Sequence, residues 1–268
     1  MQWVLAVSAS QADATLVRSD RSAPPWPAPH DATHTGAPDA AGRVVNGIVR
    51  RFRREVRRRK VARAYDMALE IGRIISVGAD VLDIGCGNGF IAHHLSALLR
   101  TNVLGIDVGN KTEAPIDYIR YDGHRLPIED HSCDAVTFCY VLHHAQDLAG
   151  LLKETRRVLR RAGLALIYED IPRTAWDKLI CWFHNQQWHK RTGPCTFRSE
   201  SQWPGIFESA GFEILSERRL SRWRNLSHPV SRRFYLLRLA HHPATGATDL
   251  QRTRRLSRRD VHAARGSN

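Results

Sequence analysis

The sequence predicts an α/β protein with a doubly wound, mostly parallel, seven-stranded sheet, an antiparallel strand at one edge, and a helical extension before the sheet. Three observations support this fold class. Apolar strands alternate with helices, a glycine-rich turn joins the first strand to the first helix, and a long stretch of helical periodicity precedes both. The chain has 268 residues, 43% of them hydrophobic, which is enough for one sizeable core. No apolar run approaches the roughly 18 residues that a membrane span needs.

Seven short apolar runs have the length and composition of buried strands. They are residues 81–84, 103–106, 118–121, 135–140, 164–168, 212–220 and 233–240. Helices are predicted at 90–100, at 148–159 with a stop at Gly163, and after the capping box Ser199-Glu200-Ser201-Gln202. Because parallel strands are joined by crossover helices, we expect helices on both faces of the sheet.

Residues 43–78 are predicted to form a basic amphipathic helical extension, as one long helix or two consecutive ones. Its first apolar positions recur at the spacing of one helix face, and they are Val45, Val49, Phe52 and Val56. Three interpretations stay open. The helix docks on the acidic domain that follows, its basic face is solvated, or residues 44–63 contact an anionic membrane surface. Docking or solvation is favoured because no Trp- or Leu-rich face accompanies the arginines.

The two ends of the chain lack periodic apolar positions. Residues 1–42 are rich in Ala, Ser, Asp and Pro, and we predict a disordered tail. Residues 241–268 are polar and rich in arginine, and we predict a disordered basic tail. The main domain is therefore expected at 79–240, with a helical lid insertion at 171–198.

Basic residues outnumber acidic ones, with 40 Lys and Arg against 27 Asp and Glu, for a net charge of +13. The excess lies on the flanks of an acidic middle, and such flanks suit nucleic acid, anionic lipid or an acidic substrate. The basic residues are almost all arginine, however, as a GC-rich genome would produce without any functional demand. The five cysteines are an odd number without paired spacing, which fits a reducing compartment. We expect a cytoplasmic protein without a signal peptide, with a membrane-peripheral location as the alternative.

The most informative segment is the turn that follows the strand at 81–84. It carries Gly85, Gly87 and Gly89, and the acidic Asp83 stands two positions before the first glycine. Glycine is needed where the backbone adopts a positive φ or must approach a ligand closely, and the helix start that follows suits an anionic group. A dinucleotide-binding turn has its third glycine three positions after the second, where this chain has Phe90.

This turn resembles motif I of the class I S-adenosylmethionine-dependent methyltransferases, and the resemblance extends over residues 80–240. Asp107 ends the second strand, where the family has the acid that holds both ribose hydroxyls, and Val108 follows it. Asp122 and Gly123 match the family's adenine-contacting pair. The resemblance implies S-adenosylmethionine as co-substrate. The implied cofactor-binding set is Asp83, Gly85, Cys86, Gly87, Gly89, Asp107, Val108, Asp122, Gly123, Cys139 and Tyr140.

The implied reaction is methyl transfer by in-line displacement to a small-molecule or lipid-like acceptor, as in the ubiquinone/menaquinone-biosynthesis, sterol and natural-product members of the family. An oxygen or nitrogen acceptor must also lose a proton. His143 and His144 follow the fourth strand at the expected substrate edge, and they are the candidate base. The alternative is that one histidine packs in the interior and the other is solvated.

The segment 171–198 is rich in aromatic residues, as an aromatic lid over an apolar substrate or an ordinary packed subdomain would be. It also contains two cysteines and two histidines, namely Cys181, His184, His189 and Cys195. Their spacing matches no common zinc pattern, and a helix turns Cys181 and His189 to different angles, so no metal site is predicted.

Two other function classes stay open. An RNA methyltransferase would use the arginine-rich flanks as a phosphate footprint, but no RNA-binding accessory domain is visible. A non-catalytic binding protein with the same fold is disfavoured by the intact glycine turn and Asp107. The oligomeric state does not follow from the sequence.

Overall fold

The computed structural model describes residues 15–17, 40–109 and 112–240 of the chain, without the side chains of 15–17, 40–47 and 191. The predicted basic tail at 241–268 lies outside the described residues, as does most of the predicted tail at 1–42. None of the helices in the described residues combines the length and apolar character required to cross a bilayer.

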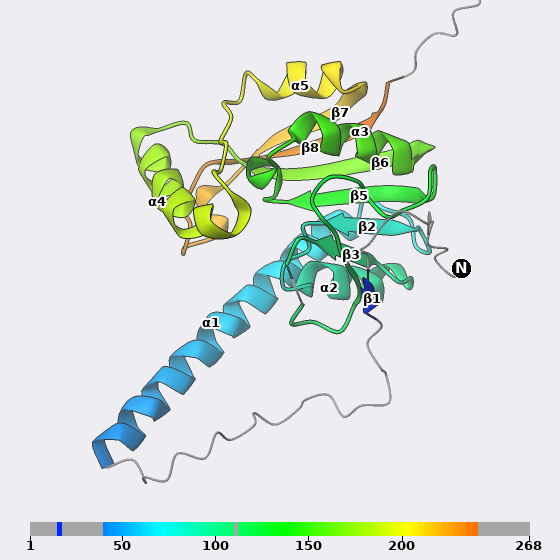
Figure 1. Ribbon diagram of the computed structural model, residues 1–268. Coiled ribbons are helices and arrows are strands. Elements are labelled where there is room, and N and C mark those ends of the chain that lie inside the picture. Colours follow the sequence, from blue (N-terminus) through cyan, green and yellow to red (C-terminus); the bar gives the residue numbers. More distant parts are fainter. Residues whose placement is uncertain (1–14, 18–39, 110–111, 241–268) are drawn as a thin grey trace, which may run out of the picture.

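A twisted sheet runs through the molecule in the strand order β1-β4-β3-β2-β5-β6-β8-β7 (Figure 1). Its strands are β1 Thr15–Val17, β2 Val81–Ile84, β3 Leu104–Asp107, β4 Asp117–Arg120, β5 Cys133–Cys139, β6 Leu159–Asp170, β7 Phe212–Leu220 and β8 Arg232–Leu239. Strands β4, β3, β2, β5 and β6 are parallel, whereas β8 is antiparallel to both β6 and β7. The predicted doubly wound sheet of seven strands is confirmed.

An eighth strand extends the sheet at the edge occupied by β4. Strand β1 pairs antiparallel with β4, with Leu16 opposite Ile119. The prediction of a disordered tail over 1–42 is therefore wrong for Thr15–Val17. The physical reason is that the outer edge of β4 presents free backbone N–H and C=O groups, which a short extended segment satisfies.

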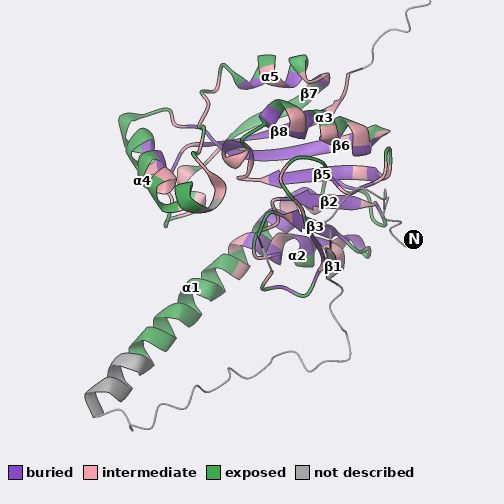
Figure 2. Ribbon diagram, in the orientation of Figure 1, coloured by how far each residue is buried: buried purple, intermediate pink, exposed green. Residues whose placement is uncertain are grey.

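Helices cover both faces of the sheet and make two hydrophobic cores. They are α1 Ala40–Gly72, α2 Phe90–Leu99, α3 Leu148–Val158, α4 Ala175–Thr192 and α5 Trp203–Ser209, with the short 3₁₀ helices η1 Leu142–His144 and η2 Arg222–Arg224. One core contains buried residues of α3 and α5, and the other contains those of α1 and α2. The central strands are buried on both faces, as the near-continuous apolar runs predict (Figure 2).

The amino-terminal extension is one helix, α1, whose two halves differ. Every residue from Ile48 to Lys60 is exposed, and this half extends away from the sheet (Figures 1 and 2). The second half packs against α2 through Ala68 and Ile71, which are fully buried. Docking is thus confirmed for the carboxyl-terminal half, whereas the arginine-rich half is solvated. Membrane contact through 44–63 stays a prediction.

Two predicted boundaries differ from the structure. Helix α3 ends at Val158, and β6 begins at Leu159 and runs through Gly163, because Leu159 already pairs with Cys133 of β5. Of the predicted capping box at Ser199–Gln202, one hydrogen bond forms, from the Ser199 N–H to the Gln202 Oε1 at 2.7 Å. The helix itself starts only at Trp203.

Candidate cofactor and active site

The glycine turn after β2 has the backbone that its sequence requires. Gly85, Gly87 and Gly89 have φ values of +71°, +54° and +75°, and Gly89 is the N-cap of α2. A Cβ added at Gly85 would lie 2.4 Å from Cγ2 of Val141, so a side chain would clash there. The turn therefore brings bare backbone close to whatever occupies the carboxyl edge of the sheet.

Asp107, the last residue of β3, lies directly against this turn. Its carboxylate accepts hydrogen bonds from the Gly87 N–H at 2.9 Å and from the Gly109 N–H at 2.8 Å. The two oxygens thus tie the glycine turn to the loop after β3. A carboxylate at a strand end can accept two hydrogen bonds from a cis-diol, so this position suits a ribose.

Asp83 is a buried acid beneath the turn, with only 2% of its surface exposed. Its Oδ1 accepts a hydrogen bond from the Thr137 hydroxyl at 2.7 Å, whereas its Oδ2 is buried and has no hydrogen-bond partner among the described residues. Burial raises the pKa of this carboxyl to about 7; the Thr137 hydrogen bond opposes the shift and Asp107 adds to it. An orphan carboxylate oxygen fits a cationic ligand group, such as the ammonium of an amino acid.

The predicted adenine side lies beside Asp107. The Tyr121 N–H donates to the Asp107 carbonyl at 3.1 Å, which places the loop after β4 next to the end of β3. Asp122 follows, its Oδ1 accepting from the His124 N–H at 2.8 Å, and Gly123 has a φ of +87°. The exposed Val108 lies close to Gly123. The structure therefore brings the residues predicted from three strand ends to one edge.

The end of β5 completes this edge. Tyr140 has a φ of +64°, which is uncommon for a non-glycine residue, and its N–H donates to the Tyr168 carbonyl at 2.8 Å. The guanidinium of Arg232 lies 5.1 Å from the centre of the Tyr140 ring. Burial raises the pKa of Cys139 well above its usual value, so this cysteine is a neutral thiol.

His143 and His144 lie just beyond Tyr140 in η1, in different environments. His143 is buried, and its Nδ1 contacts the carboxylate of Glu169. Burial opposes protonation of His143, but Glu169 outweighs it and the pKa is raised. Burial lowers the pKa of His144 to about 3, with the neighbouring His143 and His184 adding to the shift. The alternative of one packed and one solvated histidine is thus half right, since His143 is packed and His144 is partly buried.

The histidines meet residues of the 171–198 insertion. His184 of α4 lies 3.3 Å from His144, measured between their Nε2 atoms, and the Cys195 Sγ lies 3.3 Å from His144 Nδ1. The other two residues of the predicted Cys/His set are not part of this group: Cys181 is buried and His189 is exposed. Sequence spacing missed the group because it joins η1 to a helix some 40 residues later.

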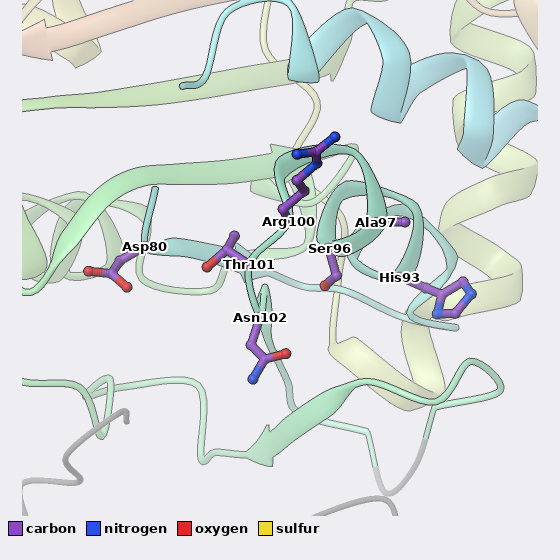
Figure 3. Close-up of a pocket in the computed structure, with 7 residues that line it drawn as sticks. All are labelled: Asp80, His93, Ser96, Ala97, Arg100, Thr101 and Asn102. Carbon is purple, nitrogen blue, oxygen red and sulfur yellow. The ribbon is translucent and has the colours of Figure 1, made fainter. Parts of the chain in front are cut away.

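Two of the hollows lined by the described residues lie at opposite ends of the parallel strands. One, of about 650 Å³, lies between α1 and η2 and includes Tyr140, Met67 and Arg224 in its lining. The other, of about 480 Å³, is lined by Asp80 before β2 and by residues from the end of α2 (Figure 3). In doubly wound sheets ligands bind at the carboxyl ends of the strands, so the hollow beside Tyr140 is the relevant one.

The exposed aromatic residues of α4 do not form a closed lid. Its apolar face carries Trp176, Leu179 and Phe183, which are 55%, 45% and 58% exposed, with Trp182 beside them. Trp188 is only partly exposed and contacts the ring of His144. The predicted lid role of 171–198 therefore stays a prediction.

A glycine turn at a helix start, carboxylates on neighbouring strand ends and the doubly wound sheet together define a nucleoside-binding α/β domain. Residues 82–167 match the family model described as "Methyltransferase domain". Residues 82–167 therefore form a methyltransferase domain, which confirms the predicted resemblance to the class I S-adenosylmethionine-dependent methyltransferases, whose co-substrate is S-adenosylmethionine.

Two relatives agree with this assignment. The chain is 27% identical to a sterol 24-C-methyltransferase of Aspergillus fumigatus over 55% of this chain and 43% of that protein. It is 29% identical to a demethylmenaquinone methyltransferase of Thermotoga maritima over 42% of this chain and 59% of that protein. It thus spans about half the length of these relatives.

The solved structures support the fold alone. The [4+2]-cyclase SpnF has a TM-score of 0.53 at 17% identity, covering 66% of this chain and 81% of its own. A S-adenosylmethionine-dependent methyltransferase from Methanosarcina mazei has a TM-score of 0.51 at 18% identity, covering 64% of this chain and 97% of its own.

Proposed function

We propose that this protein transfers the methyl group of S-adenosylmethionine to a small-molecule or lipid-like acceptor by in-line displacement. The observation that carries the proposal is the glycine turn held against Asp107, above the buried Asp83 with its orphan oxygen. The sulfonium of the co-substrate supplies an already activated methyl group. The protein then needs mainly to align donor and acceptor, which can contribute up to about 7–11 kcal/mol in well-oriented cases.

Each part of the edge has a proposed role toward the co-substrate. Asp107 accepts hydrogen bonds from the ribose hydroxyls, and Asp122, Gly123 and Val108 hold the adenine. Asp83 faces the amino-acid end, where its orphan oxygen fits an ammonium. The remaining proposed contacts come from the glycine turn and the end of β5: Gly85, Cys86, Gly87, Gly89, Cys139 and Tyr140.

The hollow beside Tyr140 supports a small acceptor. Its volume of about 650 Å³ lies within the range of about 300–1,000 Å³ that small-molecule sites occupy. Met67 and Ile91 supply apolar lining, whereas half of the lining residues are charged, among them Glu70, which accepts from Arg224 at 2.6 Å. The sterol and demethylmenaquinone methyltransferases among the relatives favour a lipid-like acceptor. Deprotonation by His143 or His144 stays a prediction.

Titration calorimetry tests the co-substrate site. Wild-type protein should bind S-adenosylmethionine and S-adenosylhomocysteine in the micromolar range, and Asp107→Ala should weaken both by 10-fold or more, because two accepting oxygens are removed. Asp117→Ala is the matched control, since this carboxylate stands at the opposite end of the neighbouring β4. Absence of binding by folded wild-type protein would overturn the proposal.

A further inference from the structure

Three histidines form a compact group beyond the end of β5. His143 and His144 come from η1, and His184 comes from α4, in the insertion after β6. Each can offer a ring nitrogen such that the three atoms all lie within 4.8 Å of one another. All three ligand atoms are imidazole nitrogens, and none of the three histidines is a proposed contact of the co-substrate, so the co-substrate site does not account for the group.

The separation of His144 and His184 matches two ligands of one metal ion. Their Nε2 atoms lie 3.3 Å apart. Zinc–nitrogen bonds of about 2.0–2.1 Å at a tetrahedral angle put two ligand nitrogens about 3.3–3.4 Å apart. A hydrogen bond between two imidazoles has a similar length, so this distance alone does not distinguish a shared metal ion from a hydrogen bond. The environment of the third histidine, His143, distinguishes them.

His143 has a ring nitrogen that a hydrogen bond does not explain. The residue is 1% exposed, and its Nδ1 contacts the Glu169 carboxylate, which leaves Nε2 as the atom it can offer. This Nε2 is buried and has no hydrogen-bond partner within the described part of the chain. Leaving a buried polar atom unpaired destabilises the fold, and a metal ion bound to this nitrogen would remove that cost.

The surroundings orient the rings as metal sites do. Glu169 holds His143 through Nδ1, the carboxylate–histidine arrangement that fixes a ligand's tautomer. His144 Nδ1 lies 3.1 Å from the Thr192 hydroxyl, so its Nε2 is turned to His184. Cys195 approaches His144 on the Nδ1 side and is therefore not a fourth ligand in this arrangement.

We propose that His143 Nε2, His144 Nε2 and His184 Nε2 bind one divalent transition-metal ion of the zinc type. Three imidazoles favour zinc, cobalt, nickel or copper over magnesium or calcium, which prefer oxygen ligands. Three protein ligands leave a fourth position for water or for a polar atom of a bound molecule. Metal binding uses the same His143 Nε2 that a general base would need, so the two roles exclude each other.

The test is zinc binding by the full chain, measured without S-adenosylmethionine so that it is independent of the proposed methyl transfer. Protein stripped with a chelator is dialysed against buffered zinc, and bound metal is counted by mass spectrometry. Wild-type protein should bind one zinc per chain. His184→Gln and His144→Gln should each weaken binding by roughly 100-fold or more, since losing even an orienting partner costs about 10–100-fold. His189→Gln, on the exposed face of the same helix, should bind like wild type.

Two further readouts guard against a merely unfolded variant. Circular dichroism should show that all three variants keep the wild-type helix content, because these side chains are only partly buried or exposed. Cobalt added to wild-type protein should give the intense visible absorption of a tetrahedral site, and His184→Gln should abolish it. No zinc bound by folded wild-type protein, or equal binding by His184→Gln and His189→Gln, would overturn the proposal.

Discussion

The buried carboxyl group of Asp83 lowers the stability of the domain and has a proposed role in ligand binding. It is buried, makes one hydrogen bond with Thr137 and leaves its second oxygen without a partner among the described residues. Such a group destabilises the domain when it is ionised without a counter-charge. The placement is understandable if the missing partner is the cationic end of a ligand, which is the role proposed here.

Asp83→Asn should reveal this cost through its pH dependence. The folded pKa of about 7 lies above the usual 3.8, so the stability linked to the proton is present at low pH and is lost as pH rises through about 7. Relative to the Asn variant, wild-type protein should lose about 3 kcal/mol of unfolding free energy between pH 5 and pH 8. Urea unfolding of both proteins at the two pH values measures this. A pH-independent difference would mean that Asp83 is already ionised at pH 5.

At the scale of elements, α1 is one helix with two kinds of surface. Met67 and Ala68 are buried against the domain, whereas Phe52 and Val49 are 68% and 38% exposed. No described part of the chain covers the apolar positions of the first half. The sequence period is the same along the whole helix, so periodicity alone does not tell which half is packed.

Two alanine substitutions in α1 should therefore differ sharply. Met67→Ala removes a buried side chain and should cost about 2–3 kcal/mol of unfolding free energy. Phe52→Ala, on the exposed half, should change it by less than about 0.5 kcal/mol. Denaturant titration followed by circular dichroism compares the two. Equal losses would show that a partner or a second copy covers the first half in solution.

On the scale of the whole molecule, the doubly wound sheet sets where ligands bind. The parallel strands β3, β2 and β5 end at the same edge, and their following loops carry Asp107, the glycine turn and Tyr140. The net charge of +13 lies instead on flanks such as the exposed half of α1. Some of this basic charge reaches the predicted ligand edge, because Lys60, Arg63 and Arg224 line the hollow beside Tyr140. The basic charge alone therefore does not separate an RNA acceptor from a small one.

Ligand binding at this edge should stabilise the entire domain. S-adenosylhomocysteine at a hundred-fold excess over its Kd should raise the unfolding free energy of wild-type protein by about 2.7 kcal/mol. Asp107→Ala should show a smaller gain at the same concentration, because its affinity is lower. Urea unfolding with and without the ligand measures both. An equal gain in the two proteins would place the ligand elsewhere.

The sequence by itself determined the fold class and the order of the elements, and it placed the proposed co-substrate residues at the carboxyl ends of the strands. Buried parallel strands, Gly85-x-Gly87-x-Gly89 and the strand-end Asp107 are patterns that can be recognised within a few residues of the chain. Only the tertiary structure decided the pairing of Thr15–Val17 with β4, the extent of β6 and the exposure of half of α1. Each of these features depends on which distant segment forms hydrogen bonds with an edge strand or covers an apolar helix face.

The histidine group makes the same distinction within the site. His143 and His144 were visible as candidates from their place after the fourth strand, but their partners Glu169 and His184 lie 26 and 40 residues further along the chain. Their rings meet only because β5 and β6 are neighbours and α4 folds back over the carboxyl edge. The spacing of residues along the chain is enough to predict a glycine turn and its function. A side-chain cluster such as the histidine group can be predicted only once the packing of its elements is known.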